Sequence, residues 1–145
     1  MRFKALMLTL VLLLPGCLDS EGEEIRFNGR NLEGSDVYMF TLEDSTGPLW
    51  NLTEQEGKVV VLAFIFTRCD NTCPVTSQNL KVVYESLTED ELAKVSFVSV
   101  TVDWRHDSPS ELNNWSDRMG YDWPHLTGAK QALDPVYENY GVFPV

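Results

Sequence analysis

The chain has 145 residues, a length that suits one domain, and 43% of them are hydrophobic, so the material for a core is present. The formal net charge is −11 at pH 7, because 22 Asp and Glu residues outnumber 11 Lys and Arg residues. Nucleic-acid binding needs basic side chains that neutralise phosphates, and no basic run is visible, so this composition argues against a nucleic-acid-binding protein.

The first residues have the pattern of a targeting segment. A basic start is followed by an apolar stretch at residues 5–14, which is too short to span a bilayer unaided. The Leu-Pro-Gly-Cys sequence that ends at Cys17 resembles a prokaryotic lipobox. We therefore expect residues 1–16 to be a lipoprotein-type signal peptide, and a lipid on Cys17 to anchor the exported protein to the outer face of the cytoplasmic membrane. The alternative is an ordinary cleaved signal that leaves Cys17 as a spare thiol.

The number of cysteines supports lipidation. Three cysteines are an odd count for an exported protein, and acylation of Cys17 leaves Cys69 and Cys73 as a pair. Outside the cytoplasmic membrane such a pair can cycle between disulfide and dithiol. Residues 17–36 are polar and acidic and contain several glycines, which predicts a tether, and residues 37–145 then form the domain.

Four segments have the composition of strands. Residues 37–42 and 49–52 are short candidates on either side of a Ser/Gly/Pro turn, which predicts an N-terminal β-hairpin. Residues 58–66 are continuously apolar after the first position, which predicts a strand buried on both faces. Residues 95–102 predict a second buried strand of the same kind.

Three segments have the apolar spacing and end signals of helices. The first covers residues 74–87, with a further capped turn at residues 88–91. The second covers residues 109–119, with Ser as its N-cap, Pro at its first position and Gly120 after its end. The third covers residues 130–140, and a short loop region precedes it. Alternation of strands and helices predicts an α/β fold with a parallel sheet.

The pair Cys69 and Cys73 lies where the first long strand gives way to a helix. The thiolate is the reactive and metal-binding form of cysteine, and the positive end of a helix lowers a thiol pKa, so this position favours redox chemistry or a soft metal. Zinc usually takes four ligands, and nothing places the two histidines near the pair, so Cu(I) fits two thiols better. A structural disulfide is the alternative for a bare Cys-x-x-x-Cys pattern.

Three motifs in order resemble the Sco/SenC family of copper metallochaperones, which assist cytochrome c oxidase assembly. The matching residues are Phe64-x-Phe66-Thr67-x-Cys69-x-x-x-Cys73-Pro74, then Asp103-x-x-x-Asp107-Ser108-Pro109, then Leu126-Thr127-Gly128 followed by Tyr140-Gly141-Val142. The resemblance implies a thioredoxin-like fold and Cu(I) held by Cys69 and Cys73. It also implies delivery of copper to oxidase subunit II, and a thiol-disulfide reductase role towards that subunit.

The chain departs from the family pattern at several places. The third copper ligand of the family is a histidine downstream of the matched region, and the chain ends before that segment. We interpret His106 as a surface residue near a helix cap and His125 as a loop or packing residue, rather than as replacement ligands. Asp70 stands where the family frequently has proline. We expect the C-terminal hairpin and last helix of the fold to be lacking, which leaves strand 58–66 with an unpaired edge and predicts an unstable or oligomeric product.

Two further sets of residues have both a functional and a structural interpretation. Asp103 and Asp107 could act in acid–base chemistry, but we favour a loop that hydrogen-bonds its own backbone before a helix. For Trp104, Trp115, Tyr121 and Trp123 we favour packing over a cofactor site. A copper metallochaperone is thus the leading hypothesis for function, ahead of a membrane-tethered thiol-disulfide oxidoreductase, an inert disulfide-containing fragment and a peroxiredoxin-like peroxidase.

Overall fold

The structure, a computed structural model, describes residues 36–144 with the exception of residue 71. These residues belong to one compact unit, Asp36–Val145. The expected signal peptide at residues 1–16, the lipid-bearing Cys17 and all but the last residue of the expected tether lie outside the described residues. No helix in the described part of the chain has the length and apolar composition needed to cross a bilayer.

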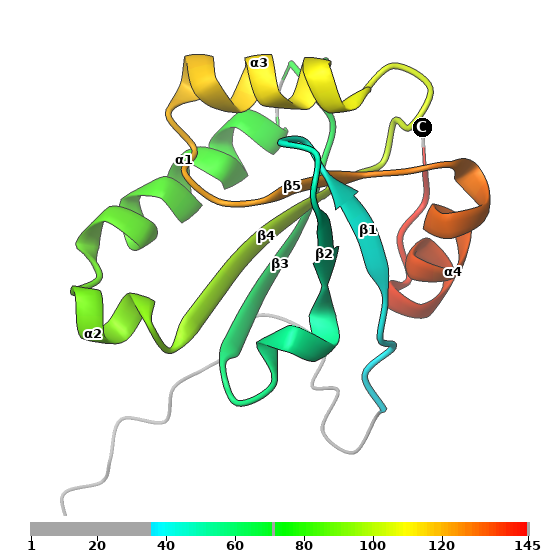
Figure 1. Cartoon of the computed structure of the whole chain (residues 1–145). Coiled ribbons are helices and arrows are strands. Elements are labelled where there is room, and N and C mark those ends of the chain that lie inside the picture. The colour runs from blue at the N-terminus through cyan, green and yellow to red at the C-terminus, as the bar shows by residue number, and fades with distance from the viewer. Residues whose placement is uncertain (1–35, 71, 145) are drawn as a thin grey trace, which may run out of the picture. The chain divides into compact units, whose positions relative to one another are not determined.

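The described residues form one five-stranded sheet with the strand order β2-β1-β5-β4-β3 (Figure 1). Its strands are β1 (Thr41–Asp44), β2 (Leu49–Asn51), β3 (Val59–Ile65), β4 (Val95–Thr101) and β5 (His125–Thr127). β3, β4 and β5 are parallel, whereas β1 is antiparallel to both β5 and β2. The predicted N-terminal hairpin and the predicted α/β class are therefore confirmed.

The helices are α1 (Thr72–Ser86), α2 (Glu89–Leu92), α3 (Pro109–Met119) and α4 (Lys130–Tyr140), and a 3-10 turn η2 (Leu52–Gln55) follows β2. Each of the three predicted helices is present within two residues of its expected limits. Ser108 caps α3 by accepting a hydrogen bond from the Glu111 N–H, and Gly120 ends that helix with a left-handed backbone.

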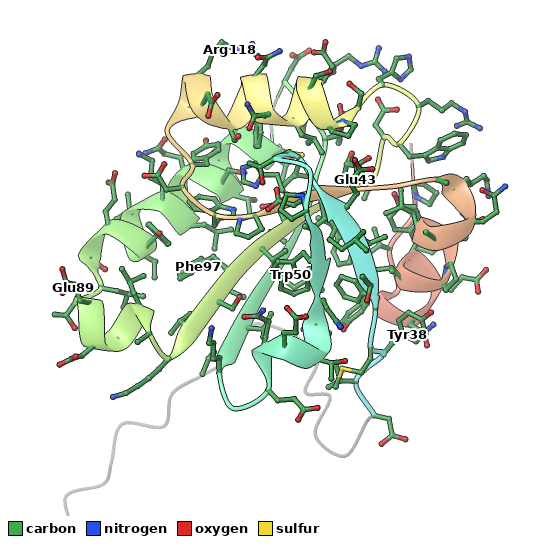
Figure 2. The ribbon with its side chains drawn as sticks, viewed as in Figure 1. Tyr38, Glu43, Trp50, Glu89, Phe97 and Arg118 are labelled. Carbon is green, nitrogen blue, oxygen red and sulfur yellow. The ribbon has the colours of Figure 1, made fainter. Side chains whose placement is uncertain are left out.

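Alternation of side chains along the strands gives the sheet two apolar faces, each with its own core. One core lies under α4 and includes Val98, Val100, Leu126, Leu133 and Val136. The other lies under α1 and α3 and includes Ile65, Cys73, Phe97, Leu112 and Trp115. Figure 2 shows Trp50 and Phe97, one from each core, directed into the molecule, with Glu89 and Arg118 at its outside.

Two expectations about strands are wrong. β3 is less buried than expected, since only Ala63 and Ile65 of its seven residues are buried and Val59 is 65% exposed. Its place at the edge of the described sheet, paired only with β4, agrees with the expected unpaired edge. The expected loop region before α4 contains β5, which is only three residues long and is held between β4 and β1. Three residues are too few to show an alternating pattern, so tertiary pairing rather than local sequence defines this strand.

Candidate thiol and metal site

The turn between β3 and α1 brings the two thiols together. The Cys69 N–H donates a hydrogen bond to the Phe66 carbonyl at 3.3 Å, which closes the turn after the strand. The Cys73 N–H, in the first turn of α1, donates to the Cys69 Sγ atom at 3.2 Å. Both side chains are thiols rather than halves of a disulfide. The sulfur of Cys69 therefore receives the N–H group that an open helix end presents.

The two thiols differ in their surroundings. Cys69 is half-buried, whereas Cys73 is only 9% exposed and packs into the core under α1. Burial, reinforced by the adjacent Cys69 thiol, raises the pKa of Cys73 to about 11. The expected lowering of the Cys73 pKa by the helix end is therefore wrong, because the cost of burying a thiolate outweighs the favourable field of the helix. A metal ion that binds Cys73 must displace its proton.

Asp107 holds the turn that precedes the thiols. Its carboxylate is fully buried and accepts hydrogen bonds from the Thr67 N–H at 3.1 Å, the Thr67 hydroxyl at 2.6 Å and the Thr101 hydroxyl at 2.5 Å. Its backbone carbonyl accepts from the Thr127 hydroxyl at 2.9 Å. Asp107 thus links the turn after β3 to the ends of β4 and β5.

Asp103 lies on the other side of the same turn. Its buried carboxylate accepts a hydrogen bond from Arg68 at 2.7 Å and lies 2.8 Å from Nδ1 of His106. Burial on its own raises the pKa of Asp103, but the hydrogen bonds from His106 and Arg68 outweigh burial and lower the pKa below its usual value. The favoured interpretation of Asp103 and Asp107 is wrong for their side chains. Their backbones do bond within the loop, but both carboxylates reach across to the thiol turn.

Neither histidine is placed as a third metal ligand. His106 is exposed near the start of α3, as expected of a surface residue. His125 lies on β5 and not on a loop, and it is a packing residue: its ring is 1% exposed and contacts Trp115, Tyr121 and Trp123. Neither of its ring nitrogens has a hydrogen-bond partner among the described residues, and burial lowers its pKa.

The aromatic residues of this region serve packing, as expected. Trp115, Tyr121 and Trp123 are buried in the core under α1 and α3, and the indole N–H of Trp123 donates to the Ser99 hydroxyl at 2.9 Å. Trp104 is half-buried, and the guanidinium of Arg105 lies over its ring.

The donors near the turn decide which metal it suits. Within residues 36–144, residue 71 aside, no group of three or more His, Cys, Asp or Glu side chains is arranged to hold a metal ion. The turn itself therefore offers two soft sulfur ligands, which fit Cu(I) and fall short of a four-coordinate zinc site. Thr67, Thr101 and Arg68 support the turn and were missed by motif reasoning, although Thr67 belongs to the motif that contains Cys69.

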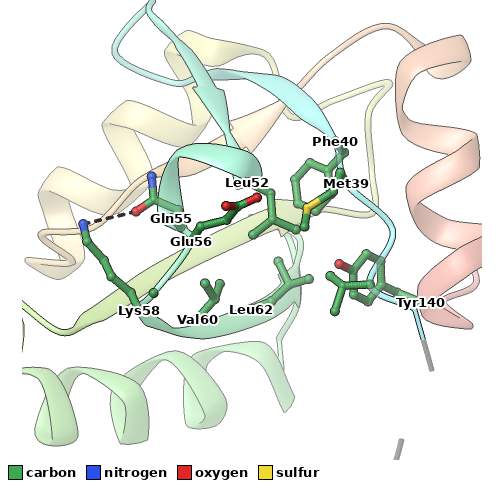
Figure 3. Close-up of a pocket in the computed structure, with 11 residues that line it drawn as sticks. Met39, Phe40, Leu52, Gln55, Glu56, Lys58, Val60, Leu62 and Tyr140 are labelled. Atoms are coloured by element: carbon green, nitrogen blue, oxygen red, sulfur yellow. Dashed lines mark hydrogen bonds between the residues drawn. The ribbon is translucent and has the colours of Figure 1, made fainter. Parts of the chain in front are cut away.

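One apolar hollow in the described structure is remote from this chemistry. It has a volume of about 390 Å³ and lies between the N-terminal segment, β3 and the end of α4, with Met39, Leu52, Val60, Leu62 and Tyr140 among its lining residues (Figure 3). Its lining is mainly apolar and includes no residue of the thiol turn. The thiols therefore do not line this hollow.

A family model and the curated relatives of this chain agree on one protein family. The model of the SCO1/SenC family matches residues 31–144. A SCO2-like protein from Rickettsia felis is 27% identical over 104 residues, which cover 72% of this chain and 50% of that protein. The chain thus spans about half the length of the curated relatives it matches.

Solved structures agree in fold. Apo Sco1 from Thermus thermophilus is 31% identical, with a TM-score of 0.71 over 84% of this chain and 70% of that one. ScoI from Bradyrhizobium japonicum, solved with copper bound, is 23% identical, with a TM-score of 0.67 over 72% of this chain and 66% of that one. The expected thioredoxin-like fold is confirmed by the first of these similarities.

Proposed function

The chain belongs to the SCO1/SenC family, and we propose that it binds Cu(I) through Cys69 and Cys73 and delivers this ion to the copper centre of cytochrome c oxidase subunit II. The observation that carries the proposal is the pair of thiols in one surface turn, where the Cys73 N–H contacts the Cys69 sulfur at 3.2 Å. The copper-bound relative from Bradyrhizobium japonicum supports the same cargo. The acceptor follows from the family resemblance.

The surroundings of the thiols suit a cargo ion. Two thiolates form a soft donor set that favours Cu(I) over harder ions. Binding requires loss of the Cys73 proton, whose pKa is about 11, so the apparent affinity rises with pH as the proton is displaced more easily. Because Cys69 is half-buried at the surface, a thiol of an acceptor protein can approach the ion from that side and exchange with it.

Anaerobic titration of the reduced chain with Cu(I) tests the proposal. We expect one copper per chain in competition with a weak Cu(I) chelator, and loss of this binding in Cys69→Ser and in Cys73→Ser. Cys17→Ser is the matched control, because it removes the third cysteine of the chain and leaves the residues of the turn unaltered, and it should retain one copper. Failure of the unaltered chain to compete with the weak chelator would refute copper binding.

A thiol-disulfide oxidoreductase is the second candidate, favoured by the same contact between Cys73 and the Cys69 sulfur, which leaves the pair close enough to close a small ring. In this role the half-buried Cys69 attacks a partner disulfide and Cys73 resolves the mixed disulfide. Measurement of the reduction potential of the pair, and of its exchange with a disulfide in subunit II, separates the two functions. Thiol-disulfide exchange that is as fast in metal-free buffer as in the presence of Cu(I) favours the oxidoreductase.

Export and lipidation of Cys17 complete the proposed function, because they hold the thiol pair outside the cytoplasmic membrane, where it can cycle between disulfide and dithiol. Fractionation of cells that express the chain should place it with membranes. Cys17→Ser should move it to the soluble exported fraction without loss of its two other thiols. An unchanged membrane fraction in Cys17→Ser would contradict anchoring by lipid at this cysteine.

A further inference from the structure

A shallow hollow of about 420 Å³ lies directly beside the thiol turn. It is lined by Phe66, Arg68, Asp103, Arg105 and His106. Phe66 accepts the hydrogen bond from the Cys69 N–H, and Arg68 immediately precedes that cysteine. The hollow and the thiols are therefore built on the same turn.

The hollow presents hydrogen-bond donors rather than acceptors. Asp103 is its only acidic side chain, and both of its oxygens are already engaged, one by Arg68 at 2.7 Å and the other by His106 at 2.8 Å. The Asp103 side chain is 5% exposed, whereas that of Arg68 is 58% exposed. A group that enters the hollow therefore contacts the side chains of Arg68 and His106, whereas the Asp103 carboxylate is buried beneath them.

Among the charged donors that line the hollow, Arg105 is the one with no hydrogen bond or ion pair to another described residue. Its guanidinium carbon lies 4.7 Å from the centre of the Trp104 ring, so the group is positioned over an aromatic face. Among the described residues, no carboxylate or carbonyl accepts a hydrogen bond from it. Arg105 is thus oriented by stacking but keeps its N–H fork available.

We propose that this hollow binds a carboxylate side chain of the protein that docks on the thiol turn, with Arg105 and Arg68 as its principal donors. The inference rests on the proposed function, because it takes that docking protein to be the copper acceptor. A planar guanidinium matches the two oxygens of a carboxylate, and an open hollow suits a side chain presented from another protein surface. In a chain of net charge −11, local donors of this kind select where an acidic partner binds.

A peptide titration of the reduced, metal-free full chain tests the inference without copper. The probe is a capped peptide with two adjacent Glu residues, and its comparison has Gln in their place. We expect the Glu peptide alone to shift the Arg side-chain Nε–Hε resonances of residues 68 and 105 in a saturable way. Arg105→Gln should weaken the binding about tenfold, as expected for one lost charge-assisted contact, and Arg105→Lys should recover only part of it.

Lys94→Gln supplies the matched control, because it removes an exposed positive charge outside the hollow and should leave peptide binding unchanged. Equal binding of the Gln peptide, or unaltered binding in Arg105→Gln, would overturn the inference. Saturation by inorganic phosphate that the Glu peptide cannot displace would also overturn it, by assigning the hollow to a small free anion. Failure of the Glu peptide to bind would not affect the outcome of the Cu(I) titration, so the carboxylate site and the copper site can be refuted independently.

Discussion

Asp107 is the residue on which the geometry of the thiol turn depends most. Its buried carboxylate takes three hydrogen bonds from Thr67 and Thr101, so Asp107→Ala leaves the half-buried Thr67 donors and the buried Thr101 hydroxyl without this acceptor. We expect a loss of about 2–4 kcal/mol in the free energy of unfolding, measured by urea denaturation, together with weaker Cu(I) binding.

Ser108→Ala is the control for that change, because it alters the neighbouring residue and removes only the cap of α3. Ser108→Ala should lower the free energy of unfolding by about 1 kcal/mol and leave Cu(I) binding unchanged. If the two variants were equally stable and bound copper equally well, the bonds from Asp107 would not be what positions the turn.

His125 should give the protein a characteristic dependence of stability on pH. Burial lowers the pKa of its ring below the usual value of 6.5, so the unfolded chain takes up a proton more readily than the folded one. Stability is therefore greatest above about pH 6.5 and falls as the pH drops below that value. Urea midpoints measured at pH 8.0 and pH 5.5 should show this loss in the unaltered chain.

The matched variant for this prediction is His125→Phe, which keeps an aromatic ring among Trp115, Tyr121 and Trp123 but cannot be protonated. It should reduce the difference between the two urea midpoints. A difference as large as that of the unaltered chain would show that another group is responsible.

For individual residues, the sequence predicts their position in the fold better than their hydrogen bonds or their pKa values. The motif places Cys69 and Cys73 at one turn because their spacing is local. The bond between Thr67 and Asp107 joins residues 40 positions apart, and no local pattern reports it. The raised pKa of Cys73 depends on which way its side chain faces, which the spacing of two cysteines does not determine.

Among the elements, helices are predicted better than strands because their ends carry local signals. α3 begins after Ser108 and ends before Gly120, as capping chemistry requires, and α4 ends before Gly141. β5 has no such signal, since it exists through its pairing with β4 and β1. The apolar run of β3 likewise predicts more burial than the strand has, because such a run does not report how completely other elements cover each face.

Gly120 gives a test of the capping argument. Its φ angle is 65°, and a Cβ atom there would lie 3.0 Å from Nζ of Lys81, which donates to the Gly120 carbonyl. Gly120→Ala should therefore lower the free energy of unfolding by about 1 kcal/mol, from left-handed strain at the end of α3. Thermal unfolding followed by circular dichroism measures the effect.

Gly128→Ala is the control for this prediction, because Gly128 does not have a positive φ and the added Cβ would meet Leu42 at 3.5 Å, an ordinary contact. Gly128→Ala should lower the free energy of unfolding clearly less than Gly120→Ala does. The opposite order would mean that side-chain crowding, and not backbone strain, governs these positions.

The whole molecule combines an acidic surface with an apolar sheet edge. β3 is seven residues long, carries no charged side chain, and pairs on one side only in the described sheet. The apolar hollow of Figure 3 lies against the face of the same strand that presents Val60 and Leu62. An edge of this kind is a template for pairing with another chain, and a net charge of −11 opposes such contact only through screened, long-range repulsion.

We therefore expect the chain, expressed without residues 1–16, to self-associate through β3, and the association to strengthen as salt screens the negative charge. Val59→Lys should shift sedimentation-velocity profiles towards monomer, because Val59 is 65% exposed at the start of β3 and lysine blunts a sheet edge. Val82→Lys adds the same charge on α1, at a valine that is 59% exposed and away from that edge, and should leave association unchanged. If both lysines dissociate the chain equally, net charge rather than edge pairing controls assembly, and if neither does, the contact lies elsewhere on the molecule.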